Sequence, residues 1–289
     1  YLGVMRAALV QCAPHLGSVA ANLDLHLDFI ARARRRKADL VVFPELSLTG
    51  YKLKDLVEEA ALDPVSSAPF RKLRAAARDL DLVVGFVEEK ASERGLFYNS
   101  AAYLRRGRLL HVHRKVFLPT FGMFEERRFF AEGRNVRAFD GPFGRTGLLI
   151  CRDFLHLNSH YLLFADGAEI SITPSAAPGR GVGSRDRGFA SSRPWELMGE
   201  TVSRLTSTFV LYCNRVGFED GAAFAGGSFV FDPFGKLVAR AAAFEPELLV
   251  VDLDLSLVRK ARKAWPLRRD DKPEVTLAAL ERIVRSYDD

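Results

Sequence analysis

Three residues that could carry out nucleophilic chemistry each follow an apolar, strand-like run. Glu45 comes after VVFP, Lys115 after RLLHVHR, and Cys151 after TGLLI. In α/β sheets, sites are commonly built where strands end. A carboxylate can take the proton of a thiol, and a nearby cation favours the thiolate and can stabilise an oxyanion. We therefore predict one nucleophilic site from these three residues, although each alone could be a loop acid, a surface lysine or a buried thiol.

The segments between these residues predict alternating strands and helices. We expect strands at MRAALVQC, LVVFP, DLVVGFVEE, TGLLIC, GAEISITP, TFVLYCNRVG and LLVVDLDL. We expect helices over about 18–37 and 156–166 and a helical region over about 53–80. Gly107 separates two runs that predict a hairpin, and Asp-Pro-Phe-Gly turns a second hairpin within GGSFVFDPFGKLVAR. Residues 115–136 have little periodicity. Because no linker or repeat interrupts the pattern, we expect a single domain over residues 1–289 of mixed α/β class.

Composition is that of an ordinary globular protein, with 48% hydrophobic and 27% charged residues among 289. No apolar run is long enough for a membrane span, and the N-terminus lacks a signal-peptide layout. Three widely spaced cysteines argue against a disulfide framework, so we expect a cytoplasmic protein. The net charge of +6 is densest in ARARRRK at residues 31–37, which predicts a solvated helix face more than a nucleic-acid patch.

Two histidine pairs are the alternative chemistry in this sequence. His111 and His113 would share a strand face, and His156 and His160 would share a helix face. No third ligand at suitable spacing accompanies either pair, and neither HExxH, GxGxxG nor a Walker motif is present. We therefore expect no metal and no cofactor. The remaining cysteines, Cys12 and Cys213, lie in apolar runs that predict core positions.

Three longer motifs contain the reactive residues, namely VVFPELSLTGY, HRKVFLPTFGMFEERRFFAEG and GLLICRDF…GAEISITPSAAP. In this order and spacing the chain resembles the nitrilase superfamily of carbon–nitrogen hydrolases over nearly its full length. The resemblance implies a four-layer α-β-β-α sandwich that forms homodimers, with Glu45 as general base, Lys115 as cation and Cys151 as nucleophile. It also implies that Glu126, which matches better than Glu125, holds the lysine in place.

The resemblance further implies hydrolysis of a small amide through a thioester. ELSLTGYKLKDL and KVFLPTFGMFEERRFF are most similar to the glutaminase domain of glutamine-dependent NAD synthetases, which implies a glutamine-like, carboxylate-bearing substrate. An anionic substrate would suit Arg152 beside the nucleophile and the arginines of the 178–193 loop, which are Arg180, Arg185, Arg187 and Arg193. The substrate-binding residues expected on this basis are Tyr51, Phe121, Arg152, Phe154 and Ser175.

Alternatives to a stand-alone amidase remain at this point. The protein could be a glutaminase subunit that supplies ammonia to a separate synthetase, because the sequence contains no SGG-type pyrophosphate-binding loop. It could hydrolyse N-carbamoyl amides, or it could be an interaction protein with little activity. An intact set of Glu45, Lys115 and Cys151 argues against the last of these.

Overall fold

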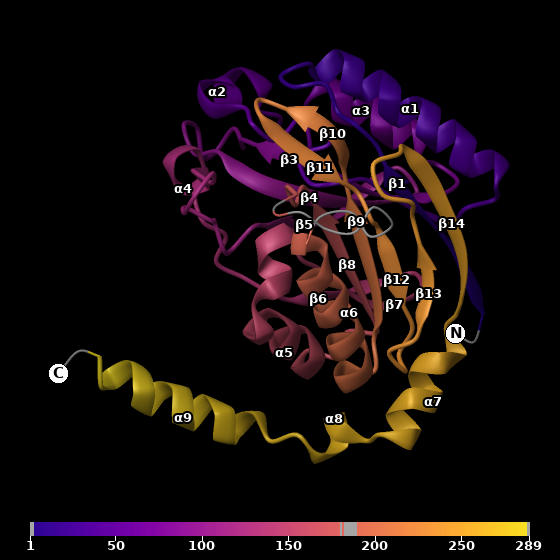
Figure 1. Cartoon of the computed structure of the whole chain (residues 1–289), viewed down its shortest axis with the longest axis vertical. Helices are drawn as coiled ribbons and strands as arrows, with labels where there is room; N and C mark the ends of the chain where they lie inside the picture. The colour runs from indigo at the N-terminus through magenta and orange to yellow at the C-terminus, as the bar shows by residue number, and fades with distance from the viewer. Residues whose placement is uncertain (1–2, 180, 182–189, 288–289) are drawn as a thin grey trace.

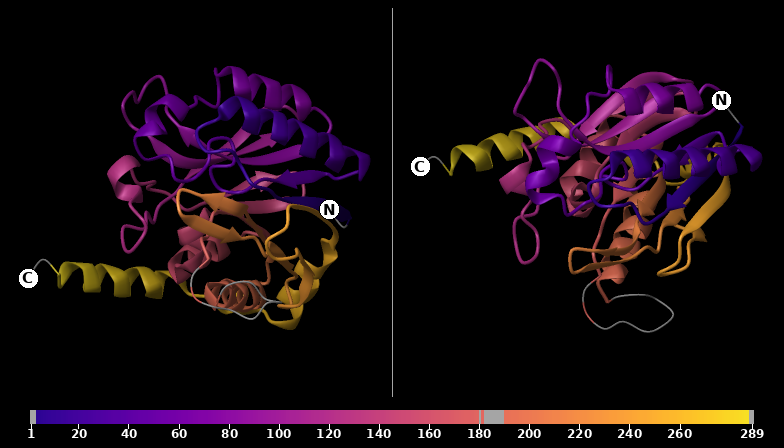
Figure 2. Two further views of the ribbon diagram at one scale, coloured as in Figure 1. Left: turned by 45° about the horizontal axis from the view of Figure 1, so that its top comes forward. Right: turned by 90° about the horizontal axis from the view of Figure 1, so that it is seen from above.

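The computed structural model describes residues 3–179, 181 and 190–287, and within them two six-stranded sheets pack face to face (Figures 1 and 2). The first sheet has the order β14-β1-β2-β3-β4-β5. Its strands are β1 (Val4–Gln11), β2 (Leu40–Val42), β3 (Asp81–Glu88), β4 (Tyr98–Arg105), β5 (Arg108–Arg114) and β14 (Glu247–Asp254).

The second sheet has the order β13-β12-β9-β8-β7-β6. Its strands are β6 (Ala138–Gly141), β7 (Gly144–Leu148), β8 (Ile170–Ser175), β9 (Phe209–Asn214), β12 (Phe229–Phe231) and β13 (Leu237–Arg240). A separate hairpin joins β10 (Val216–Glu219) to β11 (Ala222–Ala225).

Helices cover the outer face of each sheet, as the left view of Figure 2 shows. Helices α1 (Val19–Arg35) and α3 (Ala68–Ala76) lie on the first sheet, and α5 (Leu157–Ala165) and α6 (Arg193–Thr206) lie on the second. The predicted α-β-β-α sandwich is therefore confirmed. The short helices are η1 (Lys54–Leu56), α2 (Val57–Ala60), α4 (Glu126–Phe129), η2 (Cys151–Leu155) and η3 (Ala190–Ser192). At the C-terminal end, α7 (Ser256–Ala264) and α8 (Leu267–Asp270) lead to α9 (Pro273–Arg285), which extends away from the sheets (Figure 1).

Alternation along the strands creates the layers of the core. In β1, Ala7 and Leu9 pack between the two sheets, whereas Ala8 and Val10 face the helical layer. All four side chains are fully buried. Both faces of this sheet are therefore covered, which explains why its strands read as continuous apolar runs.

Strand direction brings the ends of β2 and β5 to the same edge of the first sheet. Strands β1, β2 and β3 are parallel, and two antiparallel pairings, β3 with β4 and β4 with β5, give β5 the direction of β3. In the second sheet, β7, β8 and β9 are parallel. The sheets thus position the residues that follow β2, β5 and β7.

The helical region predicted over about 53–80 consists of three separate helices. The region contains η1, α2 and α3, and an isolated bridge pairs Leu62 with Glu88 between the helices. Asp63 accepts hydrogen bonds from the backbone N–H groups of Val65 and Ser66, which competes with helical bonding. Both predicted hairpins are confirmed as β4–β5 and β12–β13, and the helix predicted over 156–166 is α5.

The basic segment at residues 31–37 forms the end of α1 and the turn after it. Arg34 donates to the Asp79 carboxylate, and Arg32 lies 3.6 Å from Asp28 in an exposed ion pair. Among the described residues, none of the helices has both the length and the apolar character that a membrane crossing requires.

Candidate active site

The Glu45 carboxylate lies in a buried loop just after β2 and accepts three hydrogen bonds. One oxygen accepts from Lys115 Nζ at 2.7 Å and from Asn99 Nδ2 at 2.8 Å. The other oxygen accepts from the backbone N–H of Ala176 at 2.8 Å. Because Ala176 directly follows β8, this last bond links the first sheet to the second. Three donors around one carboxylate fix its orientation.

Gly85 allows β3 to pass close to this loop. A Cβ atom at Gly85 would lie 2.4 Å from both the Pro44 carbonyl oxygen and the Leu46 nitrogen. The Gly85 carbonyl also accepts the backbone N–H of Leu48 at 3.0 Å. The absence of a side chain at this position therefore sets where Glu45 lies relative to β3.

The Lys115 ammonium lies fully buried between two carboxylates. Its Nζ donates to Glu45 and to Glu126, each at 2.7 Å. Burial lowers the pKa of Lys115, but the charges of Glu126 and Glu45 outweigh that effect and raise it overall. The backbone N–H of Lys115 donates to the Asn99 carbonyl at 2.8 Å, so Asn99 holds the lysine backbone and the Glu45 side chain together.

Glu126 begins the single-turn helix α4 and completes this network. Its Oε1 also accepts the Tyr51 hydroxyl at 2.6 Å. Burial raises the pKa of Glu126 to about 7, while Lys115 and the Tyr51 hydrogen bond act in the opposite direction. Glu125, by contrast, is exposed and lies 3.7 Å from Arg128. The structure thus brings Glu126, rather than Glu125, to Lys115.

The β10–β11 hairpin holds the backbone of Tyr51. A Glu219 oxygen accepts the backbone N–H groups of Tyr51 at 2.7 Å and Lys52 at 3.0 Å, and the other oxygen pairs with Arg215. Gly50 has a φ of +84°, and a Cβ there would lie 2.8 Å from the same Glu219 oxygen. This position therefore requires glycine.

Cys151 follows β7 as the first residue of η2, with a backbone φ of +42°. Such a left-handed conformation is uncommon for a side chain other than glycine and is often found at functional sites. The residue is 6% exposed. Burial raises the pKa of the Cys151 thiol well above its ordinary value and the Glu45 charge adds to this, whereas Lys115 and a hydrogen bond with Ser175 oppose it. The resting thiol is therefore neutral, and it needs a base to become a nucleophile.

Asp153 is a buried carboxylate two residues after Cys151, and the sequence analysis did not single it out. Its oxygens accept hydrogen bonds from three backbone N–H groups and from His113. Asn99 was missed in the same way. The pattern C-x-D after a strand could have drawn attention to Asp153, but three of its four donors come from a segment more than 30 residues away.

Four of the five residues predicted to bind substrate lie in or beside this network. Tyr51 contacts Glu126, and Ser175 Oγ lies 2.8 Å from the Tyr212 hydroxyl and hydrogen bonds with Cys151. The Arg152 guanidinium carbon lies 5.2 Å from the ring centre of Phe121, which is 48% exposed.

Phe154, the fifth residue, lies away from the others. Its side chain is fully buried in the core between the second sheet and its helices, where it packs against Trp195, Tyr212 and Phe229. Its predicted contact with substrate stays a prediction. The Tyr212 ring, which it packs against, carries the hydroxyl that hydrogen bonds with Ser175.

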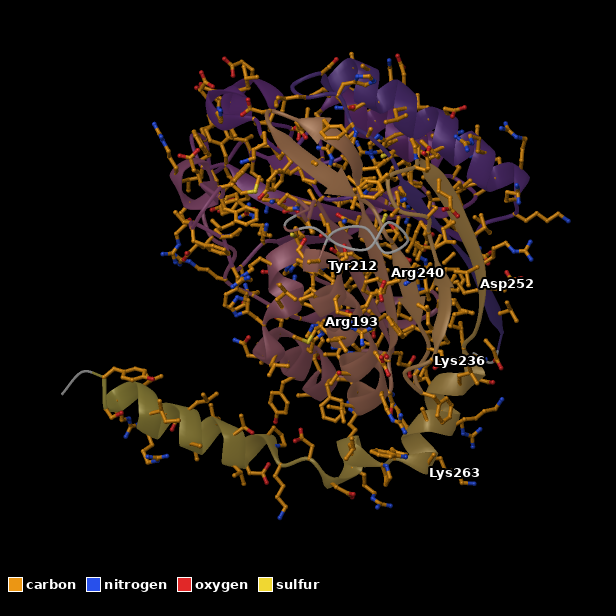
Figure 3. All side chains as sticks on the ribbon, viewed as in Figure 1. Arg193, Tyr212, Lys236, Arg240, Asp252 and Lys263 are labelled. Atoms are coloured by element: carbon orange, nitrogen blue, oxygen red, sulfur yellow. The ribbon has the colours of Figure 1, made fainter. Side chains whose placement is uncertain are left out.

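The arginines predicted to face the substrate are only partly described. Arg180, Arg185 and Arg187 lie outside the described residues. Arg193 is exposed at the first position of α6, and Figure 3 labels it below Tyr212.

Two of the cavities have walls that include residues near this network. One of about 400 Å³ lies beside Tyr212 of β9 and reaches Arg240 of β13 (Figure 3), with Trp195 and Asn214 also in its wall. The other, of about 30 Å³, is lined by Tyr51, Glu126 and neighbouring aromatic residues. Cys151 is in the wall of neither cavity.

The two histidines of each predicted pair contact different residues. His113 contacts Asp153, and His111 stacks on Phe139 with ring centres 4.4 Å apart. His156 precedes α5 and stacks on Phe117, whereas His160 lies within α5 and contacts the Phe154 carbonyl. In the described ranges, His, Cys, Asp and Glu side chains form no group of three or more that could hold a metal ion.

Comparison with known proteins gives one family. A family model described as carbon-nitrogen hydrolase matches residues 6–263. A glutamine-dependent NAD(+) synthetase from Acinetobacter baylyi is 30% identical over 257 residues, which cover 88% of this chain and 45% of that protein. The chain spans about half the length of the curated relatives it matches.

Solved structures agree over nearly the whole chain. A carbon-nitrogen hydrolase from Helicobacter pylori G27 has a TM-score of 0.83 at 25% identity, covering 96% of this chain and 99% of its own. A mutant of the amidase from Nesterenkonia sp. AN1, with the acetamide moiety of fluoroacetamide added covalently at its active-site cysteine, has a TM-score of 0.78 at 26% identity, covering 95% and 96%.

Proposed function

This chain belongs to the carbon-nitrogen hydrolase family of the nitrilase superfamily, and we propose that it is an amidase that works through a Cys151 thioester. The observation that carries this proposal is the buried network of Glu45, Lys115 and Glu126, whose charges act on the Cys151 thiol. A buried cation between two carboxylates and beside a thiol suits acyl transfer with proton exchange.

The reaction follows from the residues in the network. Glu45 takes the Cys151 proton, and the thiolate sulfur attacks the amide carbon to form a tetrahedral oxyanion. Lys115 and the backbone N–H of Arg152 stabilise that oxyanion. Glu45 then gives its proton to the leaving nitrogen as the C–N bond breaks, which leaves a thioester and free ammonia or amine. A water activated by Glu45 hydrolyses the thioester and restores the thiol.

Replacement of the nucleophile tests this assignment. We expect Cys151→Ala to abolish the release of ammonia from amides while the folded structure persists. Cys12→Ala is the matched control, because Cys12 is equally buried in the apolar core. It should lower the free energy of unfolding by about 1–3 kcal/mol and leave turnover unchanged. Near wild-type turnover in Cys151→Ala would remove Cys151 from the mechanism.

The substrate we propose is a small amide that carries a carboxylate, with glutamine as the model compound. Support comes from the similarity to glutamine-dependent NAD synthetases and from Arg152, which follows Cys151 in the sequence and whose guanidinium lies over the ring of Phe121. The test is ammonia release across glutamine, asparagine, ω-amidated acids, N-carbamoyl compounds and nitriles. Preference for an uncharged aliphatic amide over all carboxylate-bearing amides would contradict this choice.

A glutaminase that supplies ammonia to a separate synthetase is the second candidate. The observation that favours it is that the relatives combine the matched region with about as much additional sequence. Addition of an ammonia-using NAD synthetase with its substrates should then raise glutamine turnover. Turnover that is unaffected by any such synthetase would favour a stand-alone amidase.

We further propose a homodimer in a reducing compartment such as the cytoplasm. Exposed leucines on the outer helices support the dimer, and so does α9, which extends from the body with exposed apolar residues. The leucines are Leu157, Leu162, Leu197 and Leu205, and the α9 residues are Val275, Leu277, Leu280 and Val284. All three cysteines are unpaired and buried, which supports the compartment. Sedimentation at micromolar concentration tests the dimer.

A further inference from the structure

Asp153 is fully buried, and each of its oxygens accepts two hydrogen bonds. One oxygen accepts the backbone N–H groups of Val116 at 3.1 Å and Phe117 at 2.9 Å. The other accepts the backbone N–H of Ile150 at 3.1 Å and contacts His113 Nε2 at 2.9 Å. A carboxylate with four donors has no capacity left for a substrate, so Asp153 acts on the reaction through the segments that it holds.

These donors flank two of the reactive residues. His113 lies two residues before Lys115, and Val116 directly follows it. Ile150 immediately precedes Cys151. The lysine segment continues β5 of the first sheet, and the nucleophile segment continues β7 of the second. Asp153 therefore fastens the backbone that carries the cation to the backbone that carries the thiol, across the space between the sheets.

The backbone conformation of Cys151 has to be held by contacts of this kind. The backbone of Cys151 has a φ of +42°, which costs energy and persists only where surrounding contacts hold it. Asp153 supplies that contact on one side of Cys151 through Ile150, and the backbone N–H of Asp153 donates to the Ile150 carbonyl at 3.0 Å.

We propose that Asp153 is a positioning residue that sets the distance and angle between the Cys151 thiol and the Lys115 ammonium. This inference rests on the function proposed above. It assigns no contact with substrate to Asp153. Its role is to keep the cation where it favours the thiolate and the oxyanion, and a displacement of about 1 Å at such a site can cost about a hundredfold in rate.

Asp153→Asn is the sharpest test because it keeps the shape and removes one acceptor. In either orientation of the amide, its NH₂ group faces a backbone N–H, of Ile150 or of Val116 and Phe117, so one of the two segments is released. We expect kcat to fall about 10- to 100-fold with KM within about threefold. Iodoacetamide should also label Cys151 more slowly, as measured on its peptide by mass spectrometry, and the pH midpoint of labelling should rise.

Asp81→Asn is the matched control. Asp81 is a buried carboxylate at the start of β3, the end of that strand away from Gly85 and the Glu45 loop, and it accepts the Tyr103 hydroxyl at 2.8 Å. This control should lower thermal stability and leave both kcat and Cys151 labelling unchanged. If Asp153→Asn, like Asp81→Asn, lowers thermal stability but leaves kcat and Cys151 labelling unchanged, Asp153 is merely structural and the proposal is wrong.

A milder variant covers the case in which Asp153→Asn does not fold. His113→Phe keeps a ring in place and removes one of the four donors. It should slow Cys151 labelling in the same direction by a smaller factor, and a wild-type labelling profile would overturn the proposal. Labelling does not depend on the identity of the substrate. Failure of the proposed function, seen as activity in Cys151→Ala, is thus distinguished from failure of the role of Asp153.

Discussion

At Lys115, the effect of the side-chain charge can be tested separately from the effect of its donor geometry. Its Nζ meets two carboxylates at 2.7 Å each, and the side chain is completely buried. If the ammonium only lowered the pKa of the thiol, an arginine would preserve much of the rate. If it donates directly to the oxyanion, the planar guanidinium would misplace its donors.

We therefore expect Lys115→Arg to lower kcat about 100- to 1000-fold, which is the usual cost of one lost oxyanion donor. Steady-state ammonia release measures this, and circular dichroism checks the fold. Lys54→Arg makes the same exchange at an exposed ion pair with Asp220 and should leave the rate unchanged. If Lys115→Arg kept more than about a third of wild-type turnover, direct donation by Lys115 would be disproved.

At the scale of elements, the close approach of β3 to the Glu45 loop sets where the proposed general base lies. We expect Gly85→Ala to push the new methyl group into the backbone on both sides of Glu45 and to displace its carboxylate. The specific activity of the folded enzyme should fall at least about tenfold, because proton transfer requires hydrogen-bond reach. Activity is measured per folded molecule, with the folded fraction taken from thermal unfolding.

Gly107→Ala, in the turn between β4 and β5 of the same sheet, is the control for Gly85→Ala. Gly107 turns β4 into β5, has a φ of +79°, and a Cβ there would lie 2.8 Å from the Arg74 carbonyl oxygen. This variant should therefore be destabilised as well, yet its folded fraction should retain full activity. Equal losses of specific activity in both variants would show that Gly85 has no special relation to Glu45.

The sequence predicts these elements well where local pattern decides them. Glu45, Lys115 and Cys151 could be identified because each follows an apolar run, and the sheets then bring those strand ends together. Phe154 could not be placed, because only the packing of α6 and β12 reveals that its ring is enclosed. Asp153 was missed because three of its four donors belong to β5 of the other sheet or to the segment that follows it. Contacts between distant segments leave no periodic signal in the sequence. The catalytic roles of Glu45, Lys115 and Cys151 remain predictions.

At the scale of the whole molecule, buried neutral histidines make stability depend on pH. Burial lowers the pKa of both His26 and His160 from an ordinary 6.5 to about 4. In the unfolded chain these rings bind protons below pH 6.5, whereas in the folded protein they remain neutral until about pH 4. The stability that they contribute is therefore complete above pH 6.5 and is lost as the pH falls towards 4.

Replacement of one histidine isolates this effect from that of the carboxylates. We expect His160→Gln, which can keep a donor to the Phe154 carbonyl, to lose less stability than wild type between pH 7 and pH 4.5. The difference should reach up to about 3 kcal/mol. Urea unfolding at several pH values measures it. Parallel curves for the two proteins would contradict a neutral, buried His160.

The bond from Ala176 to Glu45 shows that the proposed general base of one sheet is oriented by the backbone of the other, on which the proposed nucleophile also lies. The path of the proton from thiol to carboxylate therefore depends on the thickness of the side-chain layer between the sheets. Substitutions in that layer can lengthen or shorten this path without touching either group. The rate is therefore expected to respond to residues that never meet a substrate.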